Sequence, residues 1–285
     1  MSERRSDGVV VGYDGSAQSG RAVRWAAEEA RLRGVPLTVC HAWGTYASAG
    51  PMAIPITDLR VAAERVLAEG VEHARQDTGD VRALLGNGAS APILLEAAAN
   101  AELLVVGSHG HGGFAGLLLG STAAGLAAHT PCPLVVVRSG ARRGGAAGPV
   151  VAGVDGSASS LEALALAFTE ADLRRTELVV RLAWPGSADA EGLPLVDAEG
   201  LRELAEERLA RFVAPLREQN PKIAVRTEVV RGSAREVLLH AAEEAALLVV
   251  GSRGAGGFRG LLLGSVGQAL LHHAACPVAI APHRD

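Results

Sequence analysis

The sequence repeats itself over almost its whole length, and this duplication limits the folds that the chain can adopt. Gly107 and Gly120 recur 144 positions later as Gly251 and Gly264, and the Asp-Gly-Ser at 14–16 recurs 141 positions later. The unequal displacements indicate an insertion between the two sets of markers. Because solenoid repeats are only about 20 to 50 residues long, this repeat is a duplicated globular domain.

We therefore predict two domains, residues 1–140 and 149–285, joined by a linker at 141–148. The linker region is rich in glycine and has no apolar periodicity, as expected of a loop. Each domain has about 140 residues, which is enough for one hydrophobic core.

Composition excludes several classes of protein. Hydrophobic residues make up 48% of the chain and charged residues 20%, yet no apolar run reaches the roughly 20 residues that cross a bilayer. The first residues show no secretory leader, and the three cysteines are too few for a disulfide framework. A net charge of −4 offers no basic field for nucleic acid. We expect a cytoplasmic protein that binds neither membrane nor nucleic acid.

Apolar runs alternate with amphipathic stretches in the order βαβαβαβαβ, and the second half repeats this order from Val150 to Ile280. Strands that are apolar on both sides and separated by helices predict a parallel sheet covered on both faces. We expect two tandem doubly wound α/β domains, each with a five-stranded parallel sheet. In the first half the predicted strands are 9–11, 37–39, 81–85, 103–106 and 134–137, and the predicted helices are 21–32, 59–74, 93–99 and 121–128.

One helix of the second half has a clear apolar face. The residues of this face recur at helical spacing. They are Leu201, Leu204, Ala205, Leu209, Phe212, Val213 and Leu216.

The candidate site is a glycine pattern, G-x2-G-x9-G-S, that follows an apolar strand in each half. Gly107 and Gly110 can adopt positive φ and let the backbone approach a ligand. Gly120 and Ser121 are expected to begin a helix, where free N–H groups and a hydroxyl can bind an anion. The alternative is an ordinary glycine turn with a serine cap, although the identical second copy favours a phosphate site.

Two other nucleotide signatures fail. A Walker motif is missing, and the only lysine, Lys222, is far from either loop. The letters of the dinucleotide fingerprint occur once, from Gly110 to Ala115, but Arg259 breaks them in the second half.

These motifs, with an early V-G-x-D-G-S and a later C-P before an apolar strand, resemble the universal stress protein family in a tandem form. The resemblance implies a Rossmann-like fold of the adenine nucleotide alpha hydrolase type that binds ATP, one per domain, with Mg²⁺ as a candidate counter-ion. It also implies a role in stress response or growth control, pairing of the two domains within the chain, a regulatory protein partner and, as one option for assembly, a homodimer.

The resemblance places the nucleotide contacts at matching positions of the two domains. The first set is Gly12, Asp14, Ala42, Gly107, Ser108, His109, Gly110, His111, Gly112, Gly113, Gly120, Ser121 and Thr122. The second set is Gly153, Asp155, Ala183, Gly251, Ser252, Arg253, Gly254, Ala255, Gly256, Gly257, Gly264, Ser265 and Val266.

Asp14 and Asp155 are expected to contact the ligand. The alternative is that they only stabilise a turn, because Asp-Gly-Ser before a helix is a common turn sequence.

The two loops differ in charge. His109 of the first loop is replaced by Arg253 in the second, and arginine keeps its charge at any pH. We therefore expect stronger or less pH-dependent binding in the second domain.

The motifs supply no nucleophile with a base, no paired carboxylates and no metal ligand set. The first hypothesis is a nucleotide-dependent regulator or sensor. The second is a slow ATP hydrolase or autophosphorylating protein with Ser121 or Ser265 as acceptor, and the third is an interaction protein with vestigial sites.

Overall fold

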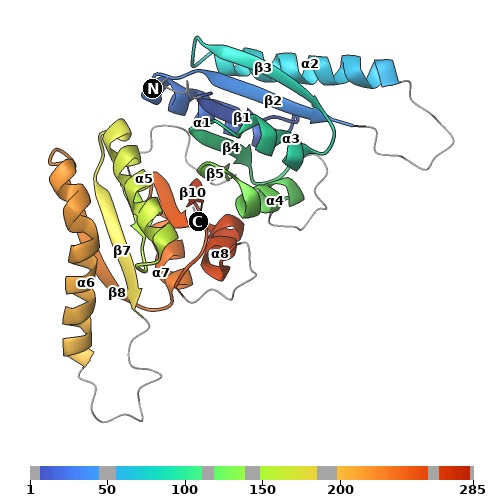
Figure 1. The fold of residues 1–285 in the computed structure, drawn as a ribbon. Coiled ribbons are helices and arrows are strands. Elements are labelled where there is room, and N and C mark those ends of the chain that lie inside the picture. Colours follow the sequence, from blue (N-terminus) through green and yellow to red (C-terminus); the bar gives the residue numbers. More distant parts are fainter. Residues whose placement is uncertain are drawn as a thin grey trace. The chain divides into compact units, whose positions relative to one another are not determined.

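The computed structural model describes residues 7–44, 56–110, 119–138, 148–184, 198–255 and 263–282. The chain divides into two compact units, residues 1–139 and 140–285, which are described separately below (Figure 1). The predicted linker at 141–148 lies outside the described residues except for Gly148, so its assignment stays a prediction.

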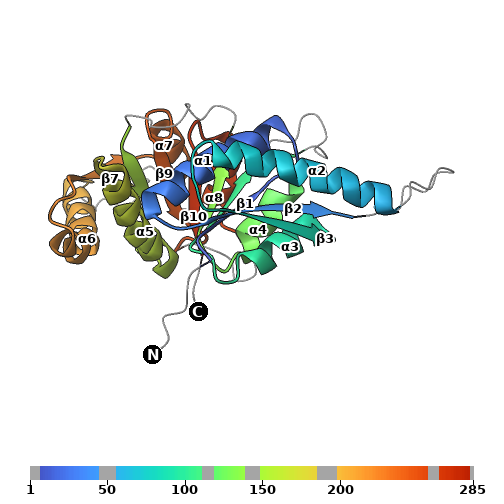
Figure 2. The same ribbon diagram turned by 90° about the horizontal axis from the view of Figure 1, so that it is seen from above.

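The first unit is a parallel sheet in the order β3-β2-β1-β4-β5. Helices α1 and α2 lie on one face of this sheet and α3 and α4 on the other, as Figure 2 shows. This arrangement confirms the predicted doubly wound fold. The elements are β1 (Val9–Gly12), α1 (Ala17–Arg33), β2 (Leu37–Trp43), α2 (Ile56–Arg75), β3 (Val81–Asn87), α3 (Ser90–Ala97), β4 (Leu103–Gly107), α4 (Ser121–His129) and β5 (Leu134–Val137).

The second unit repeats the fold with the order β8-β7-β6-β9-β10, again with parallel neighbours. The internal repeat therefore corresponds to a repeated domain. Its elements are β6 (Val150–Gly153), α5 (Ala158–Arg174), β7 (Leu178–Trp184), α6 (Ala198–Gln219), β8 (Val225–Arg231), α7 (Ala234–Ala241), β9 (Leu247–Gly251), α8 (Ser265–His273) and β10 (Val278–Ala281).

The core of each unit consists of strand residues that are buried on both faces. Val9 to Val11 in β1 and Leu103 to Val105 in β4 are at most 1% exposed. Helix α1 packs on these strands through alanines, whose small side chains let the helix lie close to the sheet. The buried alanines are Ala22, Ala26, Ala27 and Ala30.

The apolar face of α6 is shorter than predicted. Leu209 and Val213 are at most 1% exposed, whereas Leu204 is 58% exposed, so its assignment to the buried face is wrong. The first turns of α6 extend past the ends of β7 and β8 in Figure 1, and no strand lies beneath them.

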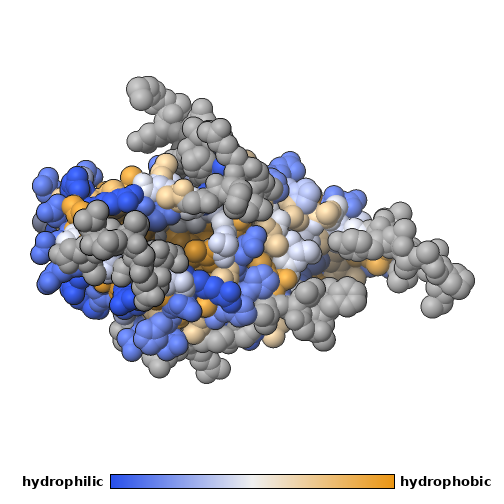
Figure 3. Space-filling model, turned by 90° about the horizontal axis from the view of Figure 1, so that it is seen from below, coloured by the Kyte–Doolittle hydropathy of each residue, from blue (hydrophilic) through white to orange (hydrophobic). Residues whose placement is uncertain are grey.

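Hydrophilic residues cover most of the coloured surface in Figure 3, and hydrophobic residues form small groups among them. No helix among the described residues is long and apolar enough to cross a bilayer.

Candidate functional site

In each unit the strand order reverses between the first and the fourth strand. Strand β1 pairs with β4 through Val11 and Val105, and β6 pairs with β9 through Gly153 and Val250. The helices that follow these paired strands lie on opposite faces of the sheet. In doubly wound sheets, ligands bind beyond the carboxyl ends of the strands at this reversal. The Asp-Gly-Ser turn and the glycine loop therefore follow neighbouring strands in each unit.

Backbone hydrogen bonds join the two ends of each glycine loop. The N–H of Gly120 donates to the carbonyl of Ser108 at 2.8 Å, and the N–H of Gly264 donates to that of Ser252 at the same distance. The fourth strand therefore ends beside the start of the following helix in both units. The middle of each loop, with His111, Gly112, Gly113, Gly256 and Gly257, lies outside the described residues.

The helices after the loops begin without a side-chain cap. Helix α4 begins at Ser121 with Gly120 as N-cap, and α8 begins at Ser265 with Gly264 as N-cap. The first N–H groups of a helix have no acceptor within it, and they carry the positive end of the helix dipole. Ser121 and Ser265 are exposed, and the next residues, Thr122 and Val266, are half-buried. These helix starts can accept an anion.

Positive φ is not the reason for glycine at positions 107 and 110, and close approach of a ligand there stays a prediction. Neither residue is among the described glycines with positive φ, nor are their counterparts in the second unit. Glycine is required at these positions because neighbouring atoms leave too little space for a Cβ. A Cβ on Gly107 would lie 3.0 Å from the backbone carbon of Gln18, and one on Gly110 would lie 2.2 Å from Oδ2 of Asp14.

The same crowding occurs in the second unit. A Cβ on Gly251 would lie 2.6 Å from the backbone carbon of Ser159, and one on Gly254 would lie 2.7 Å from Oδ2 of Asp155. Positive φ occurs instead at Gly15 and Gly156, within the two Asp-Gly-Ser turns.

Gly120 and Gly264 differ from the other loop glycines because no described residue crowds the position where their Cβ would lie. Their φ values are −74° and −68°, which any residue adopts. The nearest atoms to a Cβ would be 3.5 Å away at Gly120 and 3.6 Å away at Gly264, which is ordinary contact. A serine at either position would fit and would cap the helix better than glycine. Its hydroxyl would, however, accept hydrogen bonds from the N–H groups that an external anion needs.

Asp14 and Asp155 organise the turns at the ends of β1 and β6. The N–H of Ser16 donates to Oδ1 of Asp14 at 3.0 Å, and the N–H of Ser157 donates to Oδ1 of Asp155 at 2.9 Å. The alternative of turn chemistry is therefore correct for both residues. Contact with a ligand stays a prediction.

Asp155 also binds the second glycine loop directly. The N–H of Ala255 donates to Oδ2 of Asp155 at 2.7 Å. Burial alone would raise the pKa of Asp155, but hydrogen bonds from Ser157, Ala255 and Ser160 outweigh it and lower the pKa below its ordinary value. The carboxylate is therefore ionised and holds the loop against the end of β6.

The predicted adenine side lies at the ends of the first two strands of each unit. Gly12 pairs with Cys40, and β2 continues past this pair through Ala42. Nδ1 of His41 lies 2.7 Å from the carbonyl oxygen of Tyr13, so these strand ends are joined by a side chain as well. In the second unit, Gly153 pairs with β7 and Ala183 lies two positions beyond the pair.

Sequence reasoning missed two residues beside the second loop, Ser159 and Arg208. Ser159 is 2% exposed, and its hydroxyl donates to the carbonyl of Arg253 and lies 3.3 Å from the N–H of the same residue. Nη2 of Arg208 donates to the carbonyl of Asp155 at 3.1 Å. No motif marks these residues, because their contacts depend on how α5 and α6 pack on the sheet.

One polar atom beside the second loop has no partner. Oγ of Ser252 is the only buried side-chain nitrogen or oxygen without a hydrogen bond among the described residues. Its counterpart, Oγ of Ser108, lies 3.0 Å from Nδ1 of His109. Buried polar groups are normally satisfied, so Ser252 indicates a position that water or a ligand can complete.

The described residues contain no group of three or more His, Cys, Asp or Glu side chains that could hold a metal ion. Near the loops the described carboxylates are Asp14 and Asp155, one in each unit. A cation at either site would thus depend on ligand oxygens in addition to one carboxylate.

The fold and these loops define a class of protein, a duplicated doubly wound α/β chain with one glycine-rich strand-loop-helix junction in each half. Comparison with known proteins gives the family. The model of the universal stress protein family matches residues 6–138 and 147–282, so the chain belongs to this family.

Curated relatives match over nearly the whole chain. The universal stress protein Rv2623 of Mycobacterium tuberculosis is 37% identical and aligns over 96% of both chains. The universal stress protein Mb2028c of Mycobacterium bovis is 36% identical over 98% of both. A universal stress protein structure from Archaeoglobus fulgidus has a TM-score of 0.70 at 19% identity, covers 98% of this chain and 99% of its own, and shows the common fold.

Proposed function

We propose that each unit binds one adenine nucleotide, with ATP as the first candidate, and that the protein is a cytoplasmic regulator whose partner affinity depends on nucleotide occupancy. The phosphates bind at the start of α4 or α8, and the adenine lies toward the ends of the first two strands. The family membership and the fold support this proposal, and the geometry of the two loops supports it independently.

The observation that carries the proposal is the pair of bare helix starts at Gly120 and Gly264. Neither backbone strain nor crowding by the described residues accounts for glycine at these positions. A glycine that leaves the N–H groups uncovered is what an anion-binding helix start requires. Ser252, whose carbonyl accepts the N–H of Gly264, has a hydroxyl without a partner among the described residues, which is a second sign of an incomplete site.

Alanine variants of these two glycines test the proposal, because a Cβ at either position would make only ordinary contacts with the described residues. Gly120→Ala and Gly264→Ala each add a methyl group that the protein itself tolerates, with an expected loss of stability below about 1 kcal/mol. We expect the double variant to lose ATP binding in calorimetric titration while keeping its melting temperature within a few degrees. Gly125→Ala, within α4, is the matched control: its Cβ would lie 3.6 Å from the Cβ of Ala91, an ordinary contact, and the variant should bind ATP as the parent does. Unchanged affinity in the double variant would contradict the proposal.

A second experiment distinguishes a regulator from a hydrolase. The protein is incubated with Mg²⁺ and labelled ATP, and both nucleotide and protein are analysed. Intact nucleotide supports the regulator. Release of ADP, or label on Ser121 or Ser265, supports the alternative of a slow ATP hydrolase or autophosphorylating protein. Absence of any ATP-dependent thermal shift supports vestigial sites.

A further inference from the structure

We propose that Arg208 binds the base of the nucleotide in the second unit, with its guanidinium stacked against the adenine ring. This inference rests on the proposed function and adds the residue that favours a purine. It depends on where α6 brings this side chain and on the contacts that leave the guanidinium open on one side.

Helix α6 lies directly on the turn that follows β6. A Cβ on Gly156 would lie 2.5 Å from Cζ of Phe212 and 2.7 Å from Nη2 of Arg208, so glycine permits this close approach. The φ of Gly156 is +83°, which also favours glycine. Nη2 of Arg208 donates to the carbonyl of Asp155 at 3.1 Å. The guanidinium is therefore fixed at the carboxyl end of β6, beside the reversal of strand order.

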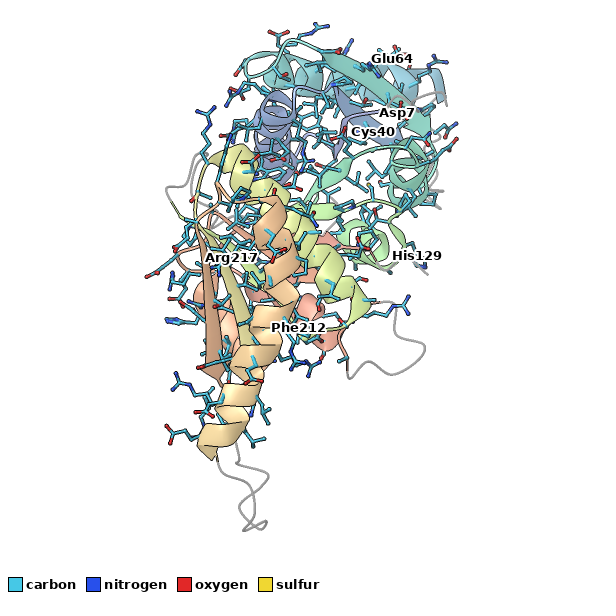
Figure 4. All side chains as sticks on the ribbon, turned by 60° about the vertical axis from the view of Figure 1, so that its left-hand side comes forward. Asp7, Cys40, Glu64, His129, Phe212 and Arg217 are labelled. Atoms are coloured by element: carbon cyan, nitrogen blue, oxygen red, sulfur yellow. The ribbon has the colours of Figure 1, made fainter. Side chains whose placement is uncertain are left out.

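One hydrogen bond and one ring hold the guanidinium in place. Its Cζ lies 5.4 Å from the centre of the Phe212 ring, which belongs to the next turn of the same helix (Figure 4). Arg208 forms no ion pair with the described residues, whereas Arg202 pairs with Glu206 on the same helix. The side chain of Arg208 is exposed. With Phe212 behind it, the guanidinium keeps its outer face and most of its five N–H donors for a ligand.

The carboxylate of Asp155 does not neutralise this arginine. Its Oδ1 accepts the N–H of Ser157 at 2.9 Å and its Oδ2 accepts the N–H of Ala255 at 2.7 Å, so both oxygens bind main-chain groups of the turn and the loop. Arg208 binds the main-chain carbonyl of the same residue instead. The positive charge of Arg208 therefore stays available at the edge of the proposed site.

Arg208 and the proposed phosphate site belong to opposite faces of the sheet. Helix α6 packs with α5 on one face, whereas α8 packs with α7 on the other. If the phosphates bind at the start of α8, the end of the nucleotide that reaches Arg208 is the base. A guanidinium is flat, positive and weakly hydrated, so it stacks well on aromatic rings. In this arrangement Arg208 lies between the Phe212 ring and the adenine.

The experiment uses the full chain with the first site blocked by Gly120→Val, so that titration measures the second site alone. ATP, AMP and UTP are titrated by calorimetry at pH 7.5, with and without Arg208→Ala. We expect Arg208→Ala to weaken ATP and AMP binding by the same factor, about five- to thirty-fold, because both carry the same base. The loss for UTP should be smaller by about two- to three-fold, since a pyrimidine offers a smaller ring for stacking.

Two further variants separate stacking from other effects. Arg211→Ala removes an exposed arginine of the same helix, whose Nε donates to the carbonyl of Glu207 within α6, and should leave all three affinities unchanged. Phe212→Leu removes the ring behind the guanidinium but keeps an apolar side chain, and should weaken ATP binding less than Arg208→Ala does. The ratio of ATP to UTP affinity is measured within one protein, so it does not depend on the fraction of each variant that is folded.

A loss that grows from AMP to ATP would place Arg208 at the phosphates and would overturn the inference. An equal loss for ATP and UTP, as expected if Arg208 only holds the turn, would also overturn it, and so would unchanged affinity. Each of these results leaves the proposed function standing. A parent protein that binds no ATP would contradict the proposed function itself.

Discussion

The backbone N–H of Ala255 donates to Oδ2 of Asp155 at 2.7 Å, across 100 positions of sequence. This bond ties the glycine loop after β9 to the turn after β6, the two segments that meet where the strand order reverses. The carboxylate therefore orders the loop whether or not it touches a ligand, which makes its protonation state part of the geometry of the site.

Asp155 should make the stability of the second unit depend on pH. Its pKa is lowered in the folded state, so its contribution is fully present above the ordinary pKa of an aspartate, about 4, and is lost as the pH falls through the folded pKa. We expect Asp155→Asn to lower the urea midpoint at pH 7 and to match the parent near pH 2. A difference between the two proteins that stays constant from pH 7 to pH 2 would contradict this role.

Gly107 and Gly251 occupy the same position of the repeat but should differ in their tolerance of alanine. A Cβ on Gly251 would approach two backbone atoms of Ser159 at 2.6 and 2.7 Å, whereas one on Gly107 would lie 3.0 and 3.1 Å from those of Gln18. Overpacking costs about 1–3 kcal/mol, and we expect Gly251→Ala near the upper end and Gly107→Ala near the lower end. Urea denaturation of both variants measures the difference. An equal loss, or a larger one for Gly107→Ala, would show that the loops relax.

The three cysteines should be inert in the folded protein. Cys40, Cys132 and Cys276 are buried, and none of them forms a disulfide. Burial raises the pKa of Cys40 to about 12 and also raises that of Cys132. At pH 8 we expect a thiol reagent to modify none of the three within minutes and all three after denaturation. Rapid modification of the folded chain would show that a strand of the core opens.

Much of this molecule can be predicted from the sequence because local patterns determine it. The buried runs at Val9 and Leu103 have the length and composition of central parallel strands, and they are strands of the sheet. The helix starts at Ser121 and Ser265 follow from the glycine that precedes each. Ser233 and Glu236 have the spacing of a capping box, and the N–H of Glu236 donates to the serine hydroxyl at 3.3 Å.

The contacts that order the second site could not be predicted in this way. Ser159 and Arg253 are 94 positions apart, and their contact depends on the rotation of α5 about its axis and its position along β9. The same applies to the crowding at Gly107, which depends on the approach of α1. Amino-acid patterns predict which face of a helix is buried but not which backbone atom it reaches.

The exchange of His109 for Arg253 between the two loops tests the expected difference between the units. An arginine is positive at every physiological pH and can form two hydrogen bonds to one phosphate. We expect His109→Arg to strengthen ATP binding by the first unit and Arg253→His to weaken binding by the second, each by about ten-fold, which is the factor of one charge-assisted contact. Calorimetric titration at pH 7.5 of chains whose other site is blocked, by Gly264→Val or Gly120→Val, measures each change. Unchanged affinity in both variants would show that these side chains do not contact the phosphates.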